Sequence, residues 1–444
     1  MKQQIQLSDH FGYGRLLRFT MPSVLMMIFT SIYGVVDGFF VSNFVGKTPF
    51  AAVNLIMPFL MVVGAFGFMF GAGGSALIAK TMGEGNLKKA REIFSLLAWA
   101  CFLCGVAVAA ISILFLRPII YALGAEGSMV EDCLLYGRII LLALPFLMLQ
   151  YAFSSYVITA EKPKLGLAIT LVAGITNMVG DFLFMAVLKW GIAGAALATG
   201  IGQIVGGVIP LIYFSRKNSS CLRLGRPKWD SQALKHTCIN GSSELMSNAS
   251  MSLVGMLYNI QLMKYAGENG VAAYGTTMYV TFIFISVFIG YATGIAPVIS
   301  FHYGAARTDE LKGLRKRSTV IILITSVLMF LISEWIALPL GKIFVGYDRE
   351  LLEMTVRSFR IYAFSFLFSG FAIFGSVFFT ALNDGLTSAL IAFLRTLLFQ
   401  AAAVMLMPLV WGLDGIWFSV VAAEVMAAAA AAVFMLLNRR KYDY

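Results

Sequence analysis

Twelve long apolar segments constrain the fold of this 444-residue chain more than any other feature of its sequence. Each segment has about 20 residues or more with few charges, which is the length that an α-helix needs to cross a bilayer. The segments are continuously apolar rather than alternating, and this pattern excludes a transmembrane β-barrel. The sequence therefore predicts an all-α membrane protein with twelve transmembrane helices. They are expected near residues 17–45, 50–79, 93–116, 133–159, 165–188, 191–214, 239–263, 271–302, 318–340, 355–382, 386–410 and 415–437.

The overall composition supports the same class of protein. Hydrophobic residues make up 59% of the chain, charged residues make up 12%, and the mean hydropathy is +0.85. In soluble domains about 25% of the residues are charged. The net charge of +11 therefore indicates basic loops beside membrane lipids, with no nucleic acid as a partner. The five cysteines predict no disulfide framework, and the polar N-terminus predicts no cleaved signal peptide.

The distribution of Lys and Arg predicts how the chain is oriented. The two tails and the loops near 80–92, 161–164, 215–236 and 305–317 contain 23 of the 33 basic residues. All six regions lie on one side of a chain with twelve spans. By the positive-inside rule, this side faces the cytoplasm. We therefore expect a multi-pass protein of the plasma membrane with both termini in the cytoplasm.

The two halves of the chain match each other at a constant offset of 221 residues. Each half contains six spans, so both insert the same way and are related by a pseudo-twofold axis along the membrane normal. We expect an N-lobe of residues 1–218, a cytoplasmic linker of residues 219–235 and a C-lobe of residues 236–444. Two similar lobes suit a carrier in which one lobe rocks against the other. The matched residues include Gly73 with Gly294, Gly83 with Gly304, Thr159 with Thr380 and Trp190 with Trp411.

Four polar residues of the N-lobe are expected at a similar depth in the membrane. At a rise of 1.5 Å per residue, Asp37, Asp181 and Thr199 lie roughly 10–12 Å from the outer ends of their spans. Asn177 lies one helical turn from Asp181, on the same face. A set of oxygen ligands suits a small hard cation such as Na⁺, and two close carboxyl groups can share a proton. The alternative is a polar network that only stabilises the helix bundle.

The internal repeat favours the ion site over the structural network. A network that merely holds six helices together would be needed in both halves of the chain. At the corresponding positions the C-lobe has Tyr258, Leu398, Ala402 and Val420, without a carboxylate. We therefore predict an N-lobe site for a coupling ion, with both Na⁺ and H⁺ as candidates.

Charged residues of the C-lobe form a second set of candidates. Arg395 and Glu424 are each expected about 14 Å deep in consecutive spans. They are predicted to form an ion pair or, alternatively, to face the substrate. Glu244, about 8 Å from the inner end of its span, is a further candidate for the substrate cavity. In the first span, Pro22 removes a backbone hydrogen bond, so a bend, mechanistic or static, is expected there.

With these residues, the chain resembles the multidrug and toxic compound extrusion (MATE) family. The resemblance rests on the twelve spans in two lobes and on MPSVLMMIFTSIYGVVDGFFV at 21–41, KTMGEGNLKKAR at 80–91, NMVGDFLF at 177–184 and WGLDGIW at 411–417. It implies a secondary active antiporter that exports amphipathic or cationic organic compounds in exchange for Na⁺ or H⁺. It also implies that the chain has no cofactor and is not an enzyme, and we expect a monomer.

The resemblance also implies which residues bind the ion. Archaeal and DinF-like members of the family use an Asp in the first helix, an N-x-x-x-D motif in the fifth and a Thr in the sixth. The NorM-like pattern, with acids deep in the seventh helix and in the tenth, does not match this chain. The matching residues here are Asp37, Asn177, Asp181, Thr199, the carbonyl donor Ala195 and the helix-bending Pro22.

Two other functions are alternatives to multidrug export for this chain. A flippase of the same superfamily for lipid-linked oligosaccharides is expected to have fourteen spans or a strongly cationic cavity. An intramembrane aspartyl protease would use two aspartates, and the segments YGVVD (33–37) and VGD (179–181) are similar to its motifs. That enzyme family needs a glycine where this chain has Met178, and it has no duplication of six spans.

Overall fold

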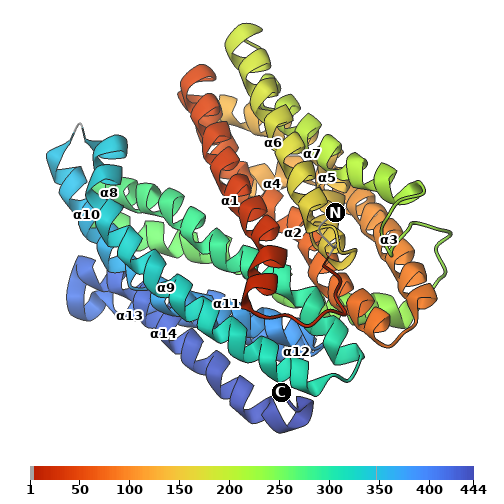
Figure 1. Cartoon of the computed structure of the whole chain (residues 1–444). Coiled ribbons are helices and arrows are strands. Elements are labelled where there is room, and N and C mark those ends of the chain that lie inside the picture. Colours follow the sequence, from red (N-terminus) through yellow and green to blue (C-terminus); the bar gives the residue numbers. More distant parts are fainter. Residues whose placement is uncertain (1–4, 347) are drawn as a thin grey trace.

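The computed structural model describes residues 5–346 and 348–444, and within them it is helical without any β-strand (Figure 1). The first half contains α1 (Tyr13–Phe44), α2 (Lys47–Gly83), α3 (Leu87–Leu114), α4 (Leu116–Ala122), α5 (Ser128–Thr159), α6 (Pro163–Asp181), the π-helix η1 (Phe182–Val187) and α7 (Gly191–Ser215). The second half contains α8 (Ser231–Gly304), α9 (Thr308–Val345), α10 (Arg349–Ala363), α11 (Phe366–Ala381), α12 (Gly385–Phe393), the π-helix η2 (Leu394–Leu398), α13 (Phe399–Leu406) and α14 (Pro408–Tyr442).

These helices form the twelve predicted spans in two lobes. In the part of the chain that the structure describes, ten helices are long and apolar enough to cross a membrane. The bent pair of α10 and α11, with 49° between its halves, makes an eleventh span. The twelfth arises because α8 comprises two helices joined at Gly267, where the backbone is not helical. The predicted all-α fold with twelve helices is therefore confirmed.

Glycines at repeat-matched positions make the turns between spans. Gly46 and Gly267 both have positive φ angles, of 108° and 59°, and Gly191 and Gly412 have φ angles of 60° and 57°. Each pair is separated by the repeat offset of 221 residues. A residue with a Cβ atom is strained at positive φ, so glycine is the residue that these turns favour. The duplication seen in the sequence is therefore present in the backbone.

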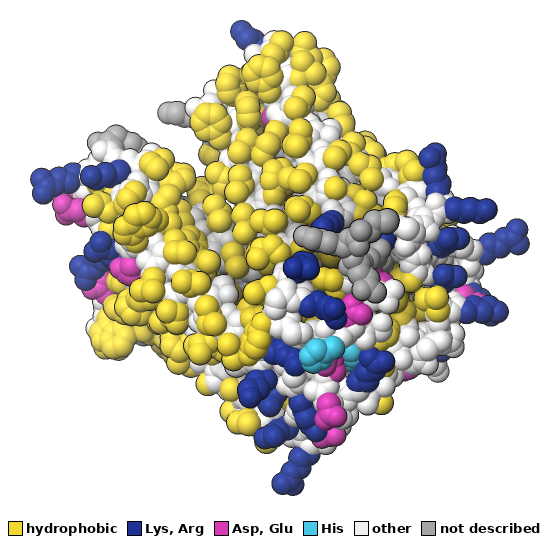
Figure 2. All heavy atoms as spheres, in the orientation of Figure 1, with side chains coloured by type: hydrophobic (Ala, Val, Ile, Leu, Met, Phe, Trp, Pro, Cys, Tyr) yellow, Lys and Arg dark blue, Asp and Glu magenta, His cyan; other side chains and the backbone are white. Residues whose placement is uncertain are grey.

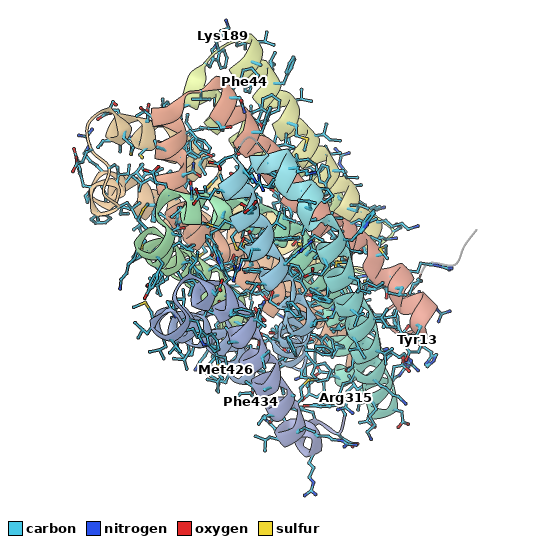
Figure 3. All side chains as sticks on the ribbon, turned by 90° about the vertical axis from the view of Figure 1, so that its left-hand side faces the viewer. Tyr13, Phe44, Lys189, Arg315, Met426 and Phe434 are labelled. Atoms are coloured by element: carbon cyan, nitrogen blue, oxygen red, sulfur yellow. The ribbon has the colours of Figure 1, made fainter. Side chains whose placement is uncertain are left out.

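The two ends of the molecule differ in charge. Figure 3 places Tyr13 and Arg315 at one end of the helices, and Phe44 and Lys189 at the other. We call the first end, which also holds the linker between α7 and α8 and the C-terminal end of α14, the basic end. Figure 2 shows a broad hydrophobic surface above it, with many Lys and Arg side chains at the lower edge. This distribution is that of a membrane protein, and the predicted cytoplasmic side is the basic end.

Glycines also hold the two lobes together in their basic halves. A Cβ atom on Gly83 of α2 would overlap the Phe301 carbonyl oxygen of α8, and one on Gly304 of α8 would overlap the Lys80 carbonyl oxygen of α2. Gly73 of α2 lies in the same way against α8, where its neighbours include Gly241. Only glycine permits backbones to approach this closely. We call these contacts of α2 with α8 the glycine seam.

Away from the basic end, the lobes separate. The buried residues of α1 fall mainly between Leu16 and Met26, and beyond Met26 only Val41 is buried. The half of α1 that contains Asp37 therefore borders open space. Figure 2 shows a hollow between the lobes at this end, surrounded by hydrophobic side chains.

Candidate functional site

The structure brings the four polar residues of the N-lobe into one cluster, which we call the N-lobe cluster. The Asn177 side-chain amide lies 3.5 Å from Asp181 Oδ1 and 3.5 Å from Thr199 Oγ1. The Thr199 hydroxyl lies 3.4 Å from Asp37 Oδ1. These contacts are long for hydrogen bonds but continuous, and they join α1, α6 and α7. Residues up to 162 positions apart in the sequence, which were expected at a similar depth in the membrane, therefore lie beside one another.

Small residues allow α6 and α7 to pack closely enough to form the cluster. A Cβ atom on Gly202 of α7 would lie 3.0 Å from the Cβ of Asn177, and one on Gly180 of α6 would lie 2.9 Å from the Cβ of Ala198. Gly194, Ala198 and Gly202 are spaced four residues apart on one face of α7. Such a stripe of small residues lets transmembrane helices approach closely. It positions Thr199 beside the polar face of α6.

The cluster contains two acceptor oxygens without a hydrogen-bond partner among the described residues. They are Asn177 Oδ1 and Asp181 Oδ2, and both are buried. Asn177 is 3% exposed and Asp181 is fully buried. Buried polar atoms are almost always paired, so orphaned oxygens at one point call for a ligand. Carboxylate, amide and hydroxyl oxygens together fit a hard cation such as Na⁺, and the two carboxyl groups also fit a proton.

A π-helical segment adjoins the cluster. The helix η1 begins at Phe182, directly after Asp181. The wider turn changes how the following backbone carbonyls pair, and π-helical turns frequently occur at functional sites. Nothing in the composition of NMVGDFLF predicts this turn, so sequence analysis missed it.

Two tyrosines also belong to the site and were missed. Tyr136 of α5 is 1% exposed, and its phenol interacts with Thr199 and faces Asp37. Tyr33 of α1 lies within electrostatic range of Asp37 and lines the same cavity as Tyr151. Depth could have identified both tyrosines, because Tyr33 lies one turn from Asp37 and Tyr136 lies about 12 Å from the start of α5.

The remaining predicted residues of the N-lobe are placed as follows. Ala195 is buried on α7, one turn before Thr199, and its role as a carbonyl ligand stays a prediction. Pro22 is buried within α1, which continues as a single helix from Tyr13 to Phe44. The bend at Pro22 is therefore also still a prediction.

An internal cavity of the N-lobe adjoins the cluster on the side of Tyr33. It lies among α1, α2, α5, α6 and α7, and its walls are mainly apolar and aromatic. Within it, the rings of Phe68 and Tyr151 stack at 3.9 Å. The volume of this cavity is about 50 Å³, below the roughly 300–1,000 Å³ of sites for organic molecules, so it would have to widen to hold one. The lining residues include Met26, Tyr33, Phe68, Gln150, Tyr151 and Gly206.

In the C-lobe, the repeat mate of Asp37 belongs to a neutral network. This residue is Tyr258, whose hydroxyl lies 2.7 Å from Ser419 Oγ and donates to Gln400 Oε1 at 3.0 Å. The Tyr258 ring also stacks on Tyr274, with centroids 5.2 Å apart. The two lobes therefore share a backbone plan, whereas only the N-lobe has carboxyl groups at this position.

The structure also brings Arg395 and Glu424 together. Arg395 Nε donates to both Glu424 oxygens at 3.2 and 3.0 Å, and Arg395 Nη2 donates at 3.0 Å. Their side chains are 16% and 5% exposed. Arg395 lies in η2, so a π-helical segment accompanies an intramembrane charge in each lobe. Glu244 is half-buried on α8, one turn from Gly241 of the glycine seam, and its carboxylate is not hydrogen-bonded to this pair.

Comparison with known protein families identifies the duplicated fold. The sequence model described as MatE matches this chain twice, at residues 22–183 and 245–406, which together make up most of its length. The chain belongs to the MatE family. The two matches coincide with the two halves of the internal repeat, and they confirm the resemblance to multidrug and toxic compound extrusion transporters.

Individual MatE relatives and structures agree with this assignment. The chain is similar to "Multidrug export protein MepA" of Staphylococcus haemolyticus (strain JCSC1435), with 23% identity over 435 residues, covering 96% of this chain and 94% of the relative. Among solved structures, "Outward-facing conformation of a multidrug resistance MATE family transporter of the MOP superfamily" has a TM-score of 0.93, 20% identity and coverage of 100% and 99%. "Crystal structure of MATE in complex with MaL6" has a TM-score of 0.92, 21% identity and the same coverage. These structures share the two-lobe fold.

Proposed function

We propose that this MatE transporter exports small amphipathic or cationic organic compounds across the plasma membrane in exchange for Na⁺ or H⁺. The N-lobe cluster is the observation that supports this function most directly. It places Asp37 and Asp181 inside an otherwise apolar helix bundle, where ionisable groups are costly and usually functional. The neutral network around Tyr258 in the other lobe supports the same conclusion, because a purely structural cluster would be needed in both.

The coupling ion binds between α1, α6 and α7 in this mechanism. A Na⁺ ion takes the Asp37 and Asp181 carboxylates, the Thr199 hydroxyl and the Asn177 carbonyl oxygen as ligands, and a proton instead resides on one of the two carboxyl groups. Either ion neutralises buried negative charge, which changes how α1 packs against α6 and α7. Since α1 also borders the cavity that contains Tyr33, ion occupancy and substrate occupancy influence each other. By linkage, the substrate then weakens ion binding by the same factor by which the ion weakens substrate binding.

Alternating access follows from the contacts between the lobes. The glycine seam closes the basic end while the lobes separate at the opposite end, so this structure corresponds to a state that is open away from the cytoplasm. Rocking about the seam would open the basic end and close the hollow. The same fold among solved relatives and the names of the MepA exporters support this direction of transport.

The test is efflux of a fluorescent organic cation such as ethidium from proteoliposomes under a separately imposed Na⁺ or H⁺ gradient. We expect wild-type protein to drive efflux, and Asp37→Asn to reduce it to the level of protein-free liposomes. Asp132→Asn is the matched control, because it makes the same substitution in the same lobe at a residue outside the cluster. Full activity of Asp37→Asn, or equal loss in Asp132→Asn, would refute the proposed role of the cluster.

A further inference from the structure

A second concave surface lies on the outside of the N-lobe, near the basic end. It is bounded by α3, α5, α7 and the linker, and its volume is about 340 Å³, within the range of roughly 300–1,000 Å³ that ligand sites occupy. It is separate from the N-lobe cluster and from the internal cavity, with which it shares no lining residue. We call it the linker groove. Its lining residues are Ala98, Trp99, Phe102, Phe146, Leu149, Leu211, Ser215, Leu224 and Gly225.

We propose that the linker groove binds an anionic phospholipid of the cytoplasmic leaflet, with an acyl chain in the groove and its phosphate at Arg216 and Arg226. The leaflet follows from the predicted orientation of the basic end. The site is independent of the coupling ion and of the exported substrate.

Hydrogen bonds fix the linker to the N-lobe and so shape the basic end of the groove. The Arg91 guanidinium donates to the Cys221 carbonyl oxygen at 2.8 Å. The Gly225 backbone N–H donates to Ser95 Oγ at 2.9 Å, and the Leu224 N–H donates to the Phe214 carbonyl oxygen at 2.9 Å. The linker is therefore an ordered wall of the groove rather than a loose connection.

Basic side chains flank this wall without protein partners. Arg216 directly follows the lining residue Ser215, and Arg226 directly follows Gly225. Both are exposed, and neither guanidinium group is hydrogen-bonded or ion-paired with a described residue. Figure 2 shows Lys and Arg side chains gathered at the right-hand edge, where Figure 1 places the linker beside the end of α3. An unpaired guanidinium beside an apolar groove is complementary to a phosphate that is attached to an acyl chain.

Exposed tryptophans place the same region at the membrane interface. Trp99 of α3 is 50% exposed and lines the groove, and Trp229 of the linker is 79% exposed. Tryptophan is enriched at the level of the lipid headgroups, because its ring is apolar and its N–H needs a polar partner. The linker segment around Trp229 therefore lies against the membrane surface, within reach of the headgroups.

The internal repeat distinguishes this groove from an ordinary lipid-facing surface. At the positions of Trp99 and Phe146, the C-lobe has Val320 and Leu367, which have no aromatic ring. The aromatic lining thus occurs in one lobe only at these positions, and the C-lobe serves as an internal control.

The experiment measures lipids retained by the full-length protein in native mass spectrometry, after detergent extraction and titration with phosphatidylglycerol or phosphatidylcholine. We expect one phosphatidylglycerol to bind more tightly than phosphatidylcholine. In the double variant Arg216→Gln with Arg226→Gln, its affinity should fall about ten-fold or more, since each basic residue near the surface favours anionic lipid. Arg439→Gln with Arg440→Gln is the matched control, because it removes two charges from the same end far from the groove.

A second variant tests the acyl-chain contact. Ser215→Trp places a large ring in the groove from an exposed position, and it should reduce phosphatidylglycerol binding without changing the charge. Glycerol 3-phosphate, which has the headgroup phosphate but no chain, should not compete. Equal retention of both lipids, equal loss in the control pair, or competition by glycerol 3-phosphate would each overturn the proposal. Transport activity is not part of this readout, so the result is independent of the function proposed above.

Discussion

At the residue scale, the two lobes differ most at one pair of repeat mates, Asp37 and Tyr258. Asp37 belongs to a cluster with two unpartnered acceptor oxygens, whereas Tyr258 has hydrogen-bond partners of its own. The N-lobe cluster therefore has acceptor oxygens that are available to an ion, whereas the Tyr258 hydroxyl in the C-lobe already has hydrogen-bond partners. Under the proposed mechanism, ion occupancy therefore acts on the N-lobe.

Thr199→Val separates the two candidate coupling ions. The substitution removes a neutral oxygen ligand that Na⁺ needs, but it leaves both carboxyl groups that can accept a proton. We expect Na⁺-driven efflux from proteoliposomes to fall at least several-fold, while H⁺-driven efflux is largely retained. Thr176→Val, at a half-buried threonine of α6 whose hydroxyl hydrogen-bonds within its own helix, is the control. Equal loss of both activities would make Thr199 a structural residue, and unchanged Na⁺-driven efflux would remove it from the ion site.

The sequence predicted the members of the cluster but not all of its surroundings. Depth along each helix and the repeat offset together selected Asp37, Asn177, Asp181 and Thr199, because helical rise is nearly constant. The approach of Tyr136 from α5 depends on how the helices rotate about their axes. That rotation follows from side-chain packing between helices, which the spacing of residues along one chain does not determine.

At the scale of the elements, small residues and π-helical segments decide how charged side chains meet. The glycines of α6 and α7 permit close packing around the cluster. The π-helical turn of η2 contains Arg395, whose guanidinium meets Glu424 of α14. The sequence predicted both spans and the depth of both residues. It did not predict the π-helical turn, because such turns are rare and nothing in the composition of LRTLL marks one.

Removing only one residue of the Arg395–Glu424 pair should destabilise the C-lobe. Removing one partner of a buried pair leaves an unpaired charge, which costs roughly 3–5 kcal/mol. We expect Arg395→Met to lower the thermal unfolding temperature in detergent, and the added Glu424→Gln to restore much of it. Arg357→Met breaks an exposed ion pair with Asp414 and should have little effect. A stable Arg395→Met protein with altered substrate preference would instead place Arg395 in the substrate cavity.

At the scale of the whole molecule, α1 packs against α8 at Gly290 and Gly294, and two further features hold the lobes together at the basic end. One is the glycine seam between α2 and α8. The other is the N-terminal segment before α1, which contacts both lobes. Its Leu7 N–H donates to Glu161 Oε1 at 2.8 Å in the N-lobe, and its Phe11 N–H donates to Glu310 Oε1 at 3.0 Å in the C-lobe. The sequence predicted the orientation of this segment but not its contacts, because nothing in its composition indicates a bridge.

On the C-lobe side, this bridge includes the Glu310 carboxylate and the Arg307 guanidinium, which donates to the Ser8 carbonyl oxygen at 2.9 Å. Glu310 also lies 2.7 Å from the His10 ring nitrogen, and its side chain is only 14% exposed. The Phe11 ring is fully buried and packs edge-on against His302 of α8. These contacts exist only while the two lobes are close at the basic end. The bridge therefore favours the state that is open at the opposite end.

Glu310→Ala should shift the protein towards the state that is open at the basic end. A hydrogen bond to a charged group contributes roughly 1.5–3 kcal/mol, which corresponds to a population shift of about ten-fold or more. The measurement is the distance distribution between spin labels at Lys164→Cys and Lys316→Cys, one on each lobe, in a background without native cysteines. We expect a longer distance to gain population. Glu350→Ala, an exposed acid at the opposite end, should leave the distribution unchanged. If Glu310→Ala also leaves it unchanged, the Glu310 hydrogen bonds do not control closure of the basic end.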